Sequence, residues 1–477
     1  MDQPPPPAKP PVYEPPDDDR PASATPTEQQ LEYETPSIAA LDRSPAPPEH
    51  DPYAALRLRE YRLYAASYVL AVIGGQAQSV AIAWEIYQKT HSKLSLGFIG
   101  GIQVIPLFVL ALPAGHLSDT MSRKQLLIFT QWMLALWGLV LAWLSYAHHD
   151  WPLLVPAMYA VILLNAITLT FARPARSAIL PQIVPARLFS NAVTWNATTF
   201  ELSMITGPAL GGFIIGYGGT PMAYLLNAAL LVACAVMTQE FPKTPVQRRE
   251  DEPPGFRSLL AGVGFVLDRK LLLATMSLDL FAVLLGGAVY LLPVFAKDIL
   301  HVGPVGFGWL RAAPSFGAVA MALILAHRPP MKRAGRALLL AVAGFGAATI
   351  IFGISRNFWL SFAMLVLTGA FDNISVVVRH TLVQLLTPDP MRGRVSAVNQ
   401  VFIGSSNELG GMESGVTAEW WGPVASVVFG GIGTLVTVLT VALLSPGLRR
   451  FGRLDQARAD EEQNMQRGFD VLVKSDV

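Results

Sequence analysis

Long apolar runs recur along most of the sequence, and they limit the folds open to this chain more than any other feature. A helix of about 20 apolar residues crosses the hydrocarbon core of a bilayer, whereas surface helices of soluble proteins keep one polar face. Here such runs alternate with short polar turns. We therefore predict an all-α polytopic membrane protein with twelve transmembrane helices. The predicted spans are 63–87, 96–115, 126–147, 152–172, 188–215, 222–239, 272–296, 305–326, 337–354, 358–378, 395–417 and 422–444.

The composition agrees with a membrane protein. Apolar residues make up 52% of the chain and charged residues only 14%, against about 25% charged residues in ordinary soluble domains. The single cysteine, Cys234, lies in an apolar run and cannot form an internal disulfide. The acidic, proline-rich N-terminus lacks the apolar segment of a cleavable signal peptide. Since the sequence shows no ATP-binding loop, metal-ligand cluster or hydrolase motif, we expect no cofactor, no metal site and no enzyme activity.

Basic residues are shared unevenly between two alternating sets of loops. One set carries eighteen lysines and arginines, and the opposite set carries only Lys89, Lys93, Lys297 and Arg356. Loops with the excess of Lys and Arg face the cytoplasm. We therefore predict that both termini and the long central loop are cytoplasmic.

Five regions differ in composition. The first holds 15 of the 37 prolines and a net charge of −8, so we predict that it is a disordered cytoplasmic tail. Within the central linker, residues 257–270 place apolar side chains at helical spacing, which predicts a short amphipathic helix on the membrane surface. The predicted regions are a tail (1–55), a six-helix bundle (56–240), a linker (241–270), a second six-helix bundle (271–446) and a C-terminal tail (447–477).

A charged turn, GHLSDTMSRK over residues 115–124, separates the second and third predicted spans. Gly115 begins it, Asp119 lies in the middle, and Arg123 and Lys124 end it. This spacing resembles the loop between the second and third helices of the major facilitator superfamily. The resemblance implies that Asp119 caps a helix and pairs with arginines at the cytoplasmic face, forming a latch that holds one conformation shut. The alternative is an ordinary charged loop that membrane topology alone explains.

Further segments resemble the same superfamily, and together the resemblance covers residues 57–446. They are similar to the enterobactin-exporter-like branch in particular. The resemblance implies the major facilitator fold, two pseudo-symmetric six-helix bundles around a central cavity, and it adds Arg173 and Arg176 to the latch. The segments that carry it are PARSAILPQIVP (174–185), 302–309, RAAP (311–314) and 379–398.

Span five contains a Gly-Pro motif that is similar to an element of exporters that exchange substrate for protons. Its members are Gly207, Pro208, Gly211 and Gly212. The family pattern has further glycines upstream, where this chain has Thr194 and Ser203. A second departure concerns the charged turn: its counterpart in the second half, residues 327–336, has no carboxylate. We interpret the glycines as a helix-packing motif, because small residues let helix backbones approach closely.

A weak internal repeat supports two related halves. The matching positions lie in a basic loop, at a proline and in a glycine-rich span of each half, which suggests duplication around a central cavity. At an offset of 203 residues, Arg176, Pro185, Asn196, Gly207 and Gly212 coincide with Arg379, Pro388, Asn399, Gly410 and Gly415.

Ionisable side chains inside the predicted spans are the candidates for proton coupling or for lining the cavity, because a charge in the membrane is costly. These candidates are Glu201, Asp279, Arg311 and Asp372. A buried carboxylate that alternates between a proton and a cationic partner suits a proton-coupled carrier. Arg311 as a mere structural partner of Asp279 or Asp372 remains an equal alternative. We interpret Glu408 and Glu413 of span eleven as structural or gating residues.

Side-chain amides in the first half are further cavity candidates, since they could hydrogen-bond a substrate. They are Gln76, Gln78, Gln103 and Asn165. Packing between helices is the alternative for each of them.

These features together predict a secondary active transporter. The favoured hypothesis is a proton-coupled exporter of small amphipathic molecules, of siderophore or drug type, that works by alternating access. Its expected partners are a small-molecule substrate, protons and membrane lipid, but not nucleic acid, and the resemblance implies a monomer. The alternatives are an importer or facilitator on the same fold, and a non-transporting membrane receptor or scaffold whose proline-rich tail recruits a partner.

Overall fold

The computed structural model describes residues 51–147, 151–242, 256–329 and 331–452. The predicted disordered tail up to residue 50, most of the central stretch and the C-terminal tail from residue 453 lie outside the described residues. The chain falls into two units, Met1–Pro52 and Tyr53–Val477, and the description below concerns the second.

Twelve long helical segments make up most of the described chain, which contains no β-strand, as an all-α membrane protein requires. In the first half they are α2 (Arg59–Thr90), α3 (Lys93–Thr120), α4 (Arg123–Ala147), α5 (Leu154–Ile183), α6 (Phe189–Gly218) and α7 (Thr220–Gln239). In the second half they are α9 (Lys270–Leu285) with its continuation, α11 (Gly303–Ala326), α12 (Ala334–Ile354), α13 (Phe358–Leu386), α14 (Asp389–Trp421) and α15 (Pro423–Leu444). The short elements are η2 (Ala55–Arg57), η3 (Ala186–Leu188), α8 (Phe256–Asp268), η4 (Ala288–Leu291), α10 (Leu292–Val294), η5 (Phe295–Ile299) and α16 (Pro446–Arg450).

Ten segments of the described chain are long and apolar enough to cross a membrane. The two long helices that fall short are α6 and α14, which occupy the same place in the two halves. Both are interrupted by polar side chains, such as Glu201 in α6 and Glu408 in α14. On the outer faces of other helices, large apolar side chains such as Phe129, Leu340 and Leu439 are exposed. An apolar surface of this kind suits contact with lipid.

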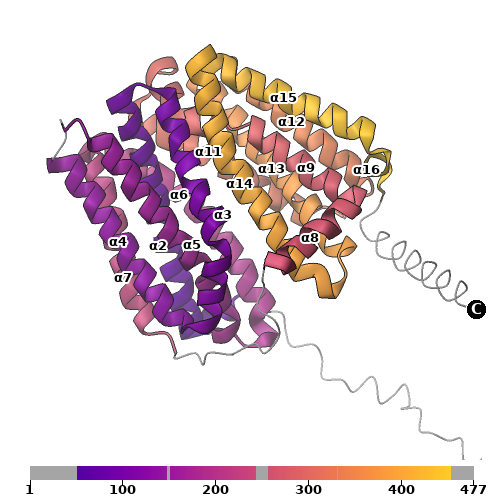
Figure 1. The fold of residues 1–477 in the computed structure, drawn as a ribbon, viewed down its shortest axis with the longest axis horizontal. Helices are drawn as coiled ribbons and strands as arrows, with labels where there is room; N and C mark the ends of the chain where they lie inside the picture. The colour runs from indigo at the N-terminus through magenta and orange to yellow at the C-terminus, as the bar shows by residue number, and fades with distance from the viewer. Residues whose placement is uncertain (1–50, 148–150, 243–255, 330, 453–477) are drawn as a thin grey trace, which may run out of the picture. The chain divides into compact units, whose positions relative to one another are not determined.

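The two halves repeat the same packing pattern (Figure 1). In the first half α2 packs on α6 and α7, α4 packs on α5 and α7, and α3 packs on α5. In the second half α9 packs on α14 and α15, α12 packs on α13 and α15, and α11 packs on α13. Each contact of the first half therefore has its counterpart, as expected for two pseudo-symmetric six-helix bundles in the major facilitator fold.

The halves meet through two equivalent pairs, α3 with α14 and α6 with α11. We use two names for the two ends of the bundles. The far end is where α2 ends and α3 begins, and the loop end is where α8 lies. Of the hydrophobic clusters in the described chain, only one draws on both halves, and it includes Tyr87 and Ile99 of the first half and Phe295 and Phe307 of the second. All four side chains lie toward the far end. The apolar seal between the halves is therefore at that end.

The predicted seventh span, 272–296, is not one continuous helix. Helix α9 ends at Leu285, and the chain continues through η4, α10 and η5. The break falls at Gly286 and Gly287, where α14 approaches closely: a Cβ on Gly287 would lie 2.6 Å from the Gly410 carbonyl oxygen. Because only glycine fits there, the helix can open and turn Tyr290 toward α14.

The amphipathic segment of the linker forms α8, close to its predicted bounds. Its apolar residues Val263 and Val266 pack in a cluster with Val395 and Val398 of α14. Gly262 lies against the Arg394 carbonyl, at which a Cβ would come within 3.0 Å. The linker helix is thus attached to the loop end of the second half.

Candidate functional site

A buried ion pair joins α9 and α13 inside the second half. The Arg379 guanidinium pairs with the Asp279 carboxylate, and both side chains are almost fully shielded, at 3% and 10% exposure. The alternative that Arg311 neutralises Asp279 is therefore wrong, because Arg379 occupies that place. Arg379 follows the predicted span 358–378, and it lies inside the bundle because the helix that carries it, α13, extends to Leu386.

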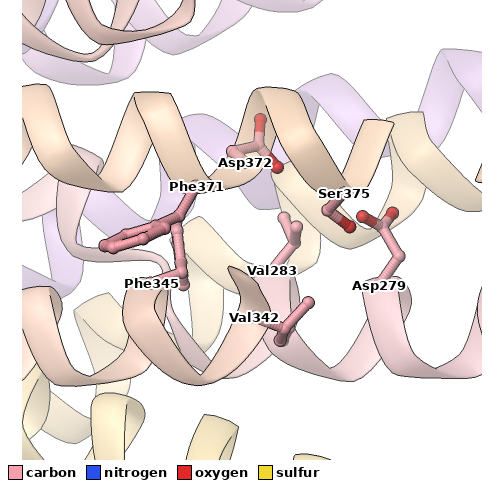
Figure 2. A pocket seen from close by; sticks show the side chains of 8 residues that line it. Asp279, Val283, Val342, Phe345, Phe371, Asp372 and Ser375 are labelled. Atoms are coloured by element: carbon pink, nitrogen blue, oxygen red, sulfur yellow. The ribbon is translucent and has the colours of Figure 1, made fainter. Parts of the chain in front are cut away.

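Asp372 lies on α13 about two turns before Arg379 and lines a small cavity with Asp279 and Ser375 (Figure 2). The cavity measures about 10 Å³ and its other walls are apolar. No ion pair joins Asp372 to a cationic side chain in the described part of the chain. The structure thus brings together two of the four predicted charged candidates, Asp279 and Asp372, and gives only one of them a fixed cation.

Arg311 faces a different carboxylate. The Tyr290 hydroxyl donates to Oε2 of Glu408 at 2.5 Å, and the Arg311 charge acts on both groups. The charge of Arg173, from the first half, also acts on Glu408. The sequence did not predict that Tyr290, Arg311 and Glu408 lie together. Tyr290 contacts Glu408 only because the helix breaks after α9, and no sequence pattern predicted that break.

The first half contributes arginines and aromatic rings. The Arg176 guanidinium lies over the Tyr68 ring, 5.1 Å from its centroid, and Tyr68 stacks on Phe200 with centroids 6.1 Å apart. Glu201 follows Phe200 and is partly buried, and its charge acts on Asp372 across the halves. We refer to Tyr68, Arg173, Arg176 and Phe200 as the arginine–aromatic wall. A surface of this composition can bind a planar or anionic group by stacking and charge.

The four predicted amides have different surroundings. Gln78 is buried and accepts a hydrogen bond from the Asn227 side chain at 2.6 Å, which is a packing role between α2 and α7. Gln76, Gln103 and Asn165 are partly buried. The Gln76 Oε1 atom has no hydrogen-bond partner among the described residues, so Gln76 keeps a free polar group for a ligand or water.

Basic residues of the predicted latch bind within the first half. Arg123 Nη1 donates to the Ala178 carbonyl at 3.2 Å, and Lys124 Nζ donates to the carbonyls of Gln239 and Phe241 at 2.7 and 2.5 Å. These contacts tie the start of α4 to the ends of α5 and α7. The Asp119 side chain lies outside what the structure describes, and a Cβ on Gly115 would meet no atom within 4 Å.

Polar contacts join the halves at the far end, on residues outside the predicted site. Glu419 of α14 accepts hydrogen bonds from the backbone N–H groups of Lys93 and Leu94 at 2.9 and 3.1 Å, and from the Ser92 hydroxyl at 3.2 Å. It thereby caps the N-terminus of α3, where a carboxylate also interacts favourably with the helix dipole. The available signal was Ser92 itself, a typical N-cap residue before an apolar run.

A second polar contact seals the far end between α2 and the continuation of α9. The Tyr87 hydroxyl donates to the Asp298 carboxylate, and the Lys297 ammonium lies 5.7 Å from the centroid of the Tyr87 ring. Together with the Glu419 contact, this forms what we call the far-end lock. Its two parts hold each half to the other beside the shared apolar cluster.

The Gly-Pro motif of α6 packs against two helices. Gly207 and Gly211 face α2, and a Cβ on Gly211 would lie 2.7 Å from the Cα of Ala77. Gly212 faces α11, and a Cβ there would lie 2.5 Å from the Pro304 carbonyl oxygen. The motif therefore allows contact both within the first half and between the halves.

Among the described residues, no three His, Cys, Asp or Glu side chains gather as a metal ion would need. Glu85, which is buried, uses its two oxygens to accept hydrogen bonds from Ser145 and Tyr224 at 2.6 and 2.8 Å. That carboxylate therefore has a structural role inside the first half.

Comparison with known proteins agrees with this geometry. A family model described as transmembrane secretion effector matches residues 50–472. The chain is 26% identical over 375 residues to the enterobactin exporter EntS of Citrobacter koseri, covering 78% of this chain and 88% of that protein. The same figures hold for the enterobactin exporter EntS of Escherichia coli O1:K1 / APEC.

Solved transporter structures share the fold at low sequence identity. A mutant of the nucleoside transporter NupG superposes with a TM-score of 0.64 at 14% identity, covering 81% of this chain and all of that one. The xylose transporter XylE from E. coli superposes with a TM-score of 0.60 at 12% identity, covering 86% of this chain and 99% of that one. These likenesses show the fold.

Proposed function

Because the chain belongs to the transmembrane secretion effector family, a group of transporters with the major facilitator fold, we propose that it is a proton-coupled exporter of small amphipathic molecules. It works by alternating access in the inner membrane of a bacterium, with both termini in the cytoplasm. Its substrates are of siderophore or drug type, and it acts as a monomer.

The observation that carries this proposal is the presence of charged side chains inside the helices of both halves. Glu201 of α6 and Glu408 of α14 lie on helices through which the halves meet, and Asp372 lies on α13 of the second half. Charged groups are retained inside membrane spans where they serve a pathway for substrate or ions. Charges placed on both halves change their distances when the halves rock, which is what coupling requires.

The position of the far-end lock supports one state of the proposed cycle. Since basic loops indicate that the loop end is cytoplasmic, a seal at the far end corresponds to an inward-facing state. Opening to the outside then requires the contacts of Glu419 and Tyr87 to break, and a new seal to form at the loop end. The charged turn with Asp119 is the proposed place for that second seal.

The arginine–aromatic wall supports an acidic, partly aromatic substrate. Arg173 and Arg176 supply positive charge, while Tyr68 and Phe200 supply flat apolar surface. The related EntS proteins are enterobactin exporters. A siderophore-type substrate is therefore favoured over a cationic drug, because a cation would be repelled by the two arginines.

Transport by purified protein in liposomes tests the proposal. The vesicles contain a pH-sensitive dye, a proton gradient is imposed, and siderophores and drugs are added one at a time. We expect an acidic aromatic compound to discharge the gradient. Equilibration of a labelled compound without proton movement would show a facilitator instead, and uptake driven by the gradient in the opposite direction would show an importer.

A pair of variants adds the substrate-site control. Arg176→Gln removes a charge from the wall, so we expect KM to rise about tenfold or more, as for a lost charge-assisted hydrogen bond. Arg187→Gln removes an exposed arginine of η3 and should leave KM unchanged. Equal values for both variants would place the substrate elsewhere.

A further inference from the structure

The small cavity is lined by residues of α9, α12 and α13, all of which belong to the second half. Its volume of about 10 Å³ is roughly the space that one water molecule needs. Three polar side chains line it, namely Asp279, Asp372 and Ser375, among apolar walls that include Val342 and Phe345. A polar spot of this size inside an apolar bundle suits one small, hydrogen-bonding guest.

Charges around the cavity do not balance. Arg379 neutralises Asp279, whereas Asp372 has no ion-pair partner in the part of the chain that the structure describes. With both carboxylates ionised, these three side chains carry one net negative charge. One bound proton brings the cluster to neutrality.

Neighbouring elements offer Asp372 no additional cation. Helix α9 presents Asp279, α6 presents Glu201, and α12 has its single charged residue, Arg336, at its start. Arg311 of α11 acts on Tyr290 and Glu408 instead. Along α13, Arg379 is engaged by Asp279, and His380 lies eight residues away, about 12 Å along the helix. Among the described residues, the negative charge of Asp372 is therefore left without a fixed cation.

Ser375 provides the second, independent observation. Its side chain is buried at 3% exposure, lines the cavity and makes no hydrogen bond with any described residue. In Figure 2 it lies between the Asp372 and Asp279 side chains, with its hydroxyl oxygen toward Asp279. A hydroxyl can donate and accept at once, so Ser375 and one water molecule can connect the acid form of Asp372 with the Asp279 carboxylate.

We infer that Asp372 carries the coupling proton, that Ser375 and one water molecule in the cavity solvate it, and that the Asp279–Arg379 ion pair, which is neutral overall, stays fixed beside it. The Asp372 carboxylate accepts a proton from a hydronium ion on the outer side, giving the neutral acid and water. It returns the proton to water on the inner side, regenerating the carboxylate. This inference rests on the proposed proton-coupled export.

Infrared difference spectroscopy of the lipid-reconstituted protein, titrated with acid in the absence of substrate, tests the assignment directly. We expect a titrating C=O band of a protonated carboxylic acid in the wild type, complete loss of this band in Asp372→Asn, and its return in Asp372→Glu. Glu201→Gln and Glu408→Gln should keep the band. Ser375→Ala should keep it at a shifted frequency, because the acid loses a hydrogen-bond partner.

The assignment is overturned if Asp372→Asn keeps the full band, or if Glu201→Gln or Glu408→Gln removes it. A parallel measurement of substrate-driven proton release in liposomes separates this failure from failure of the proposed function. Proton release with an unchanged band in Asp372→Asn supports coupled export and refutes Asp372 as the carrier. A band that depends on Asp372, without proton release by the wild type for any compound, supports the proton site and refutes coupled export.

Discussion

At the scale of single residues, Asp279 and Arg379 show how a charge is tolerated in the interior of a membrane protein. Each is shielded from solvent, and each is the other's counter-ion. The Arg379 Nε atom has no hydrogen-bond partner among the described residues, so the pair is not fully satisfied. Losing one member of such a pair costs more than losing both, because an uncompensated buried charge remains.

We therefore predict that Asp279→Asn lowers stability strongly, by about 3 to 5 kcal/mol, and that Asp279→Asn combined with Arg379→Gln recovers most of the loss. Thermal unfolding in detergent, followed by tryptophan fluorescence, gives the Tm of each variant. The double variant melting lower than Asp279→Asn would mean that the two charges do not depend on each other.

Glu419 illustrates a residue whose role depends on another helix. It is exposed and lies beyond the predicted span 395–417. Hydrogen bonds from the backbone N–H of Leu94, the backbone N–H of Lys93 and the Ser92 hydroxyl hold the pKa of its carboxyl below the usual range. A lowered pKa means that the ionised form is bound better in this state. The contact is therefore present above the ordinary carboxyl pKa and is lost as pH falls through the lowered value.

We predict that the far-end lock resists mild acid and that Glu419→Gln weakens it at neutral pH. Spin labels at Gln88→Cys and His301→Cys, in a Cys234→Ala background, report the distance between the halves at the far end. The variant should populate a longer distance at neutral pH, while the unsubstituted lock should lengthen only in strong acid. An unchanged distribution in Glu419→Gln would show that the cap does not hold the halves together.

At the scale of elements, most of the helix pattern was readable from apolar runs, and the exceptions have physical reasons. Helices α6 and α14 are polar because each carries charges toward the boundary between the halves, as Glu201 and Glu408 show. The break after α9 follows from close approach to Gly410, a tertiary contact. The sequence could propose Asp279 and Asp372 as candidates, but partners such as Arg379 depend on helix lengths and rotations that apolar runs do not specify.

Glycine contacts between elements lead to a test of the seal. A Cβ on Gly212 would lie 2.5 Å from the Pro304 carbonyl oxygen and 2.7 Å from the Cα of Gly308. Gly212→Ala should therefore force α6 and α11 apart, lengthen the far-end distance between spin labels and reduce transport at least tenfold. Gly75→Ala in α2 is the matched control, because its Cβ would meet no atom within 4 Å. Equal losses in both variants would point to general destabilisation.

At the scale of the whole molecule, the two halves have the same internal helix contacts, but the described contacts that join them are concentrated at one end. The cluster shared by both halves and both parts of the far-end lock lie at one end. At the other end, the hydrogen bonds of Arg123 to Ala178 and of Lys124 to Gln239 and Phe241 join segments of the first half. Under the alternating access proposed above, such an arrangement would be one of the two end states of the cycle. The opposite state must break the far-end contacts.

Fixing the far end should consequently stop transport. Ser92 and Glu419 lie in contact across the halves, with the Ser92 Oγ 3.2 Å from the Glu419 carboxylate. Ser92→Cys with Glu419→Cys, in a Cys234→Ala background, can be joined by a short, reducible bifunctional thiol reagent. We expect the joined protein to lose transport and to regain it after reduction, while each single-cysteine variant treated alike stays active. Full transport by the joined protein would contradict alternating access, because the far end could then never have opened.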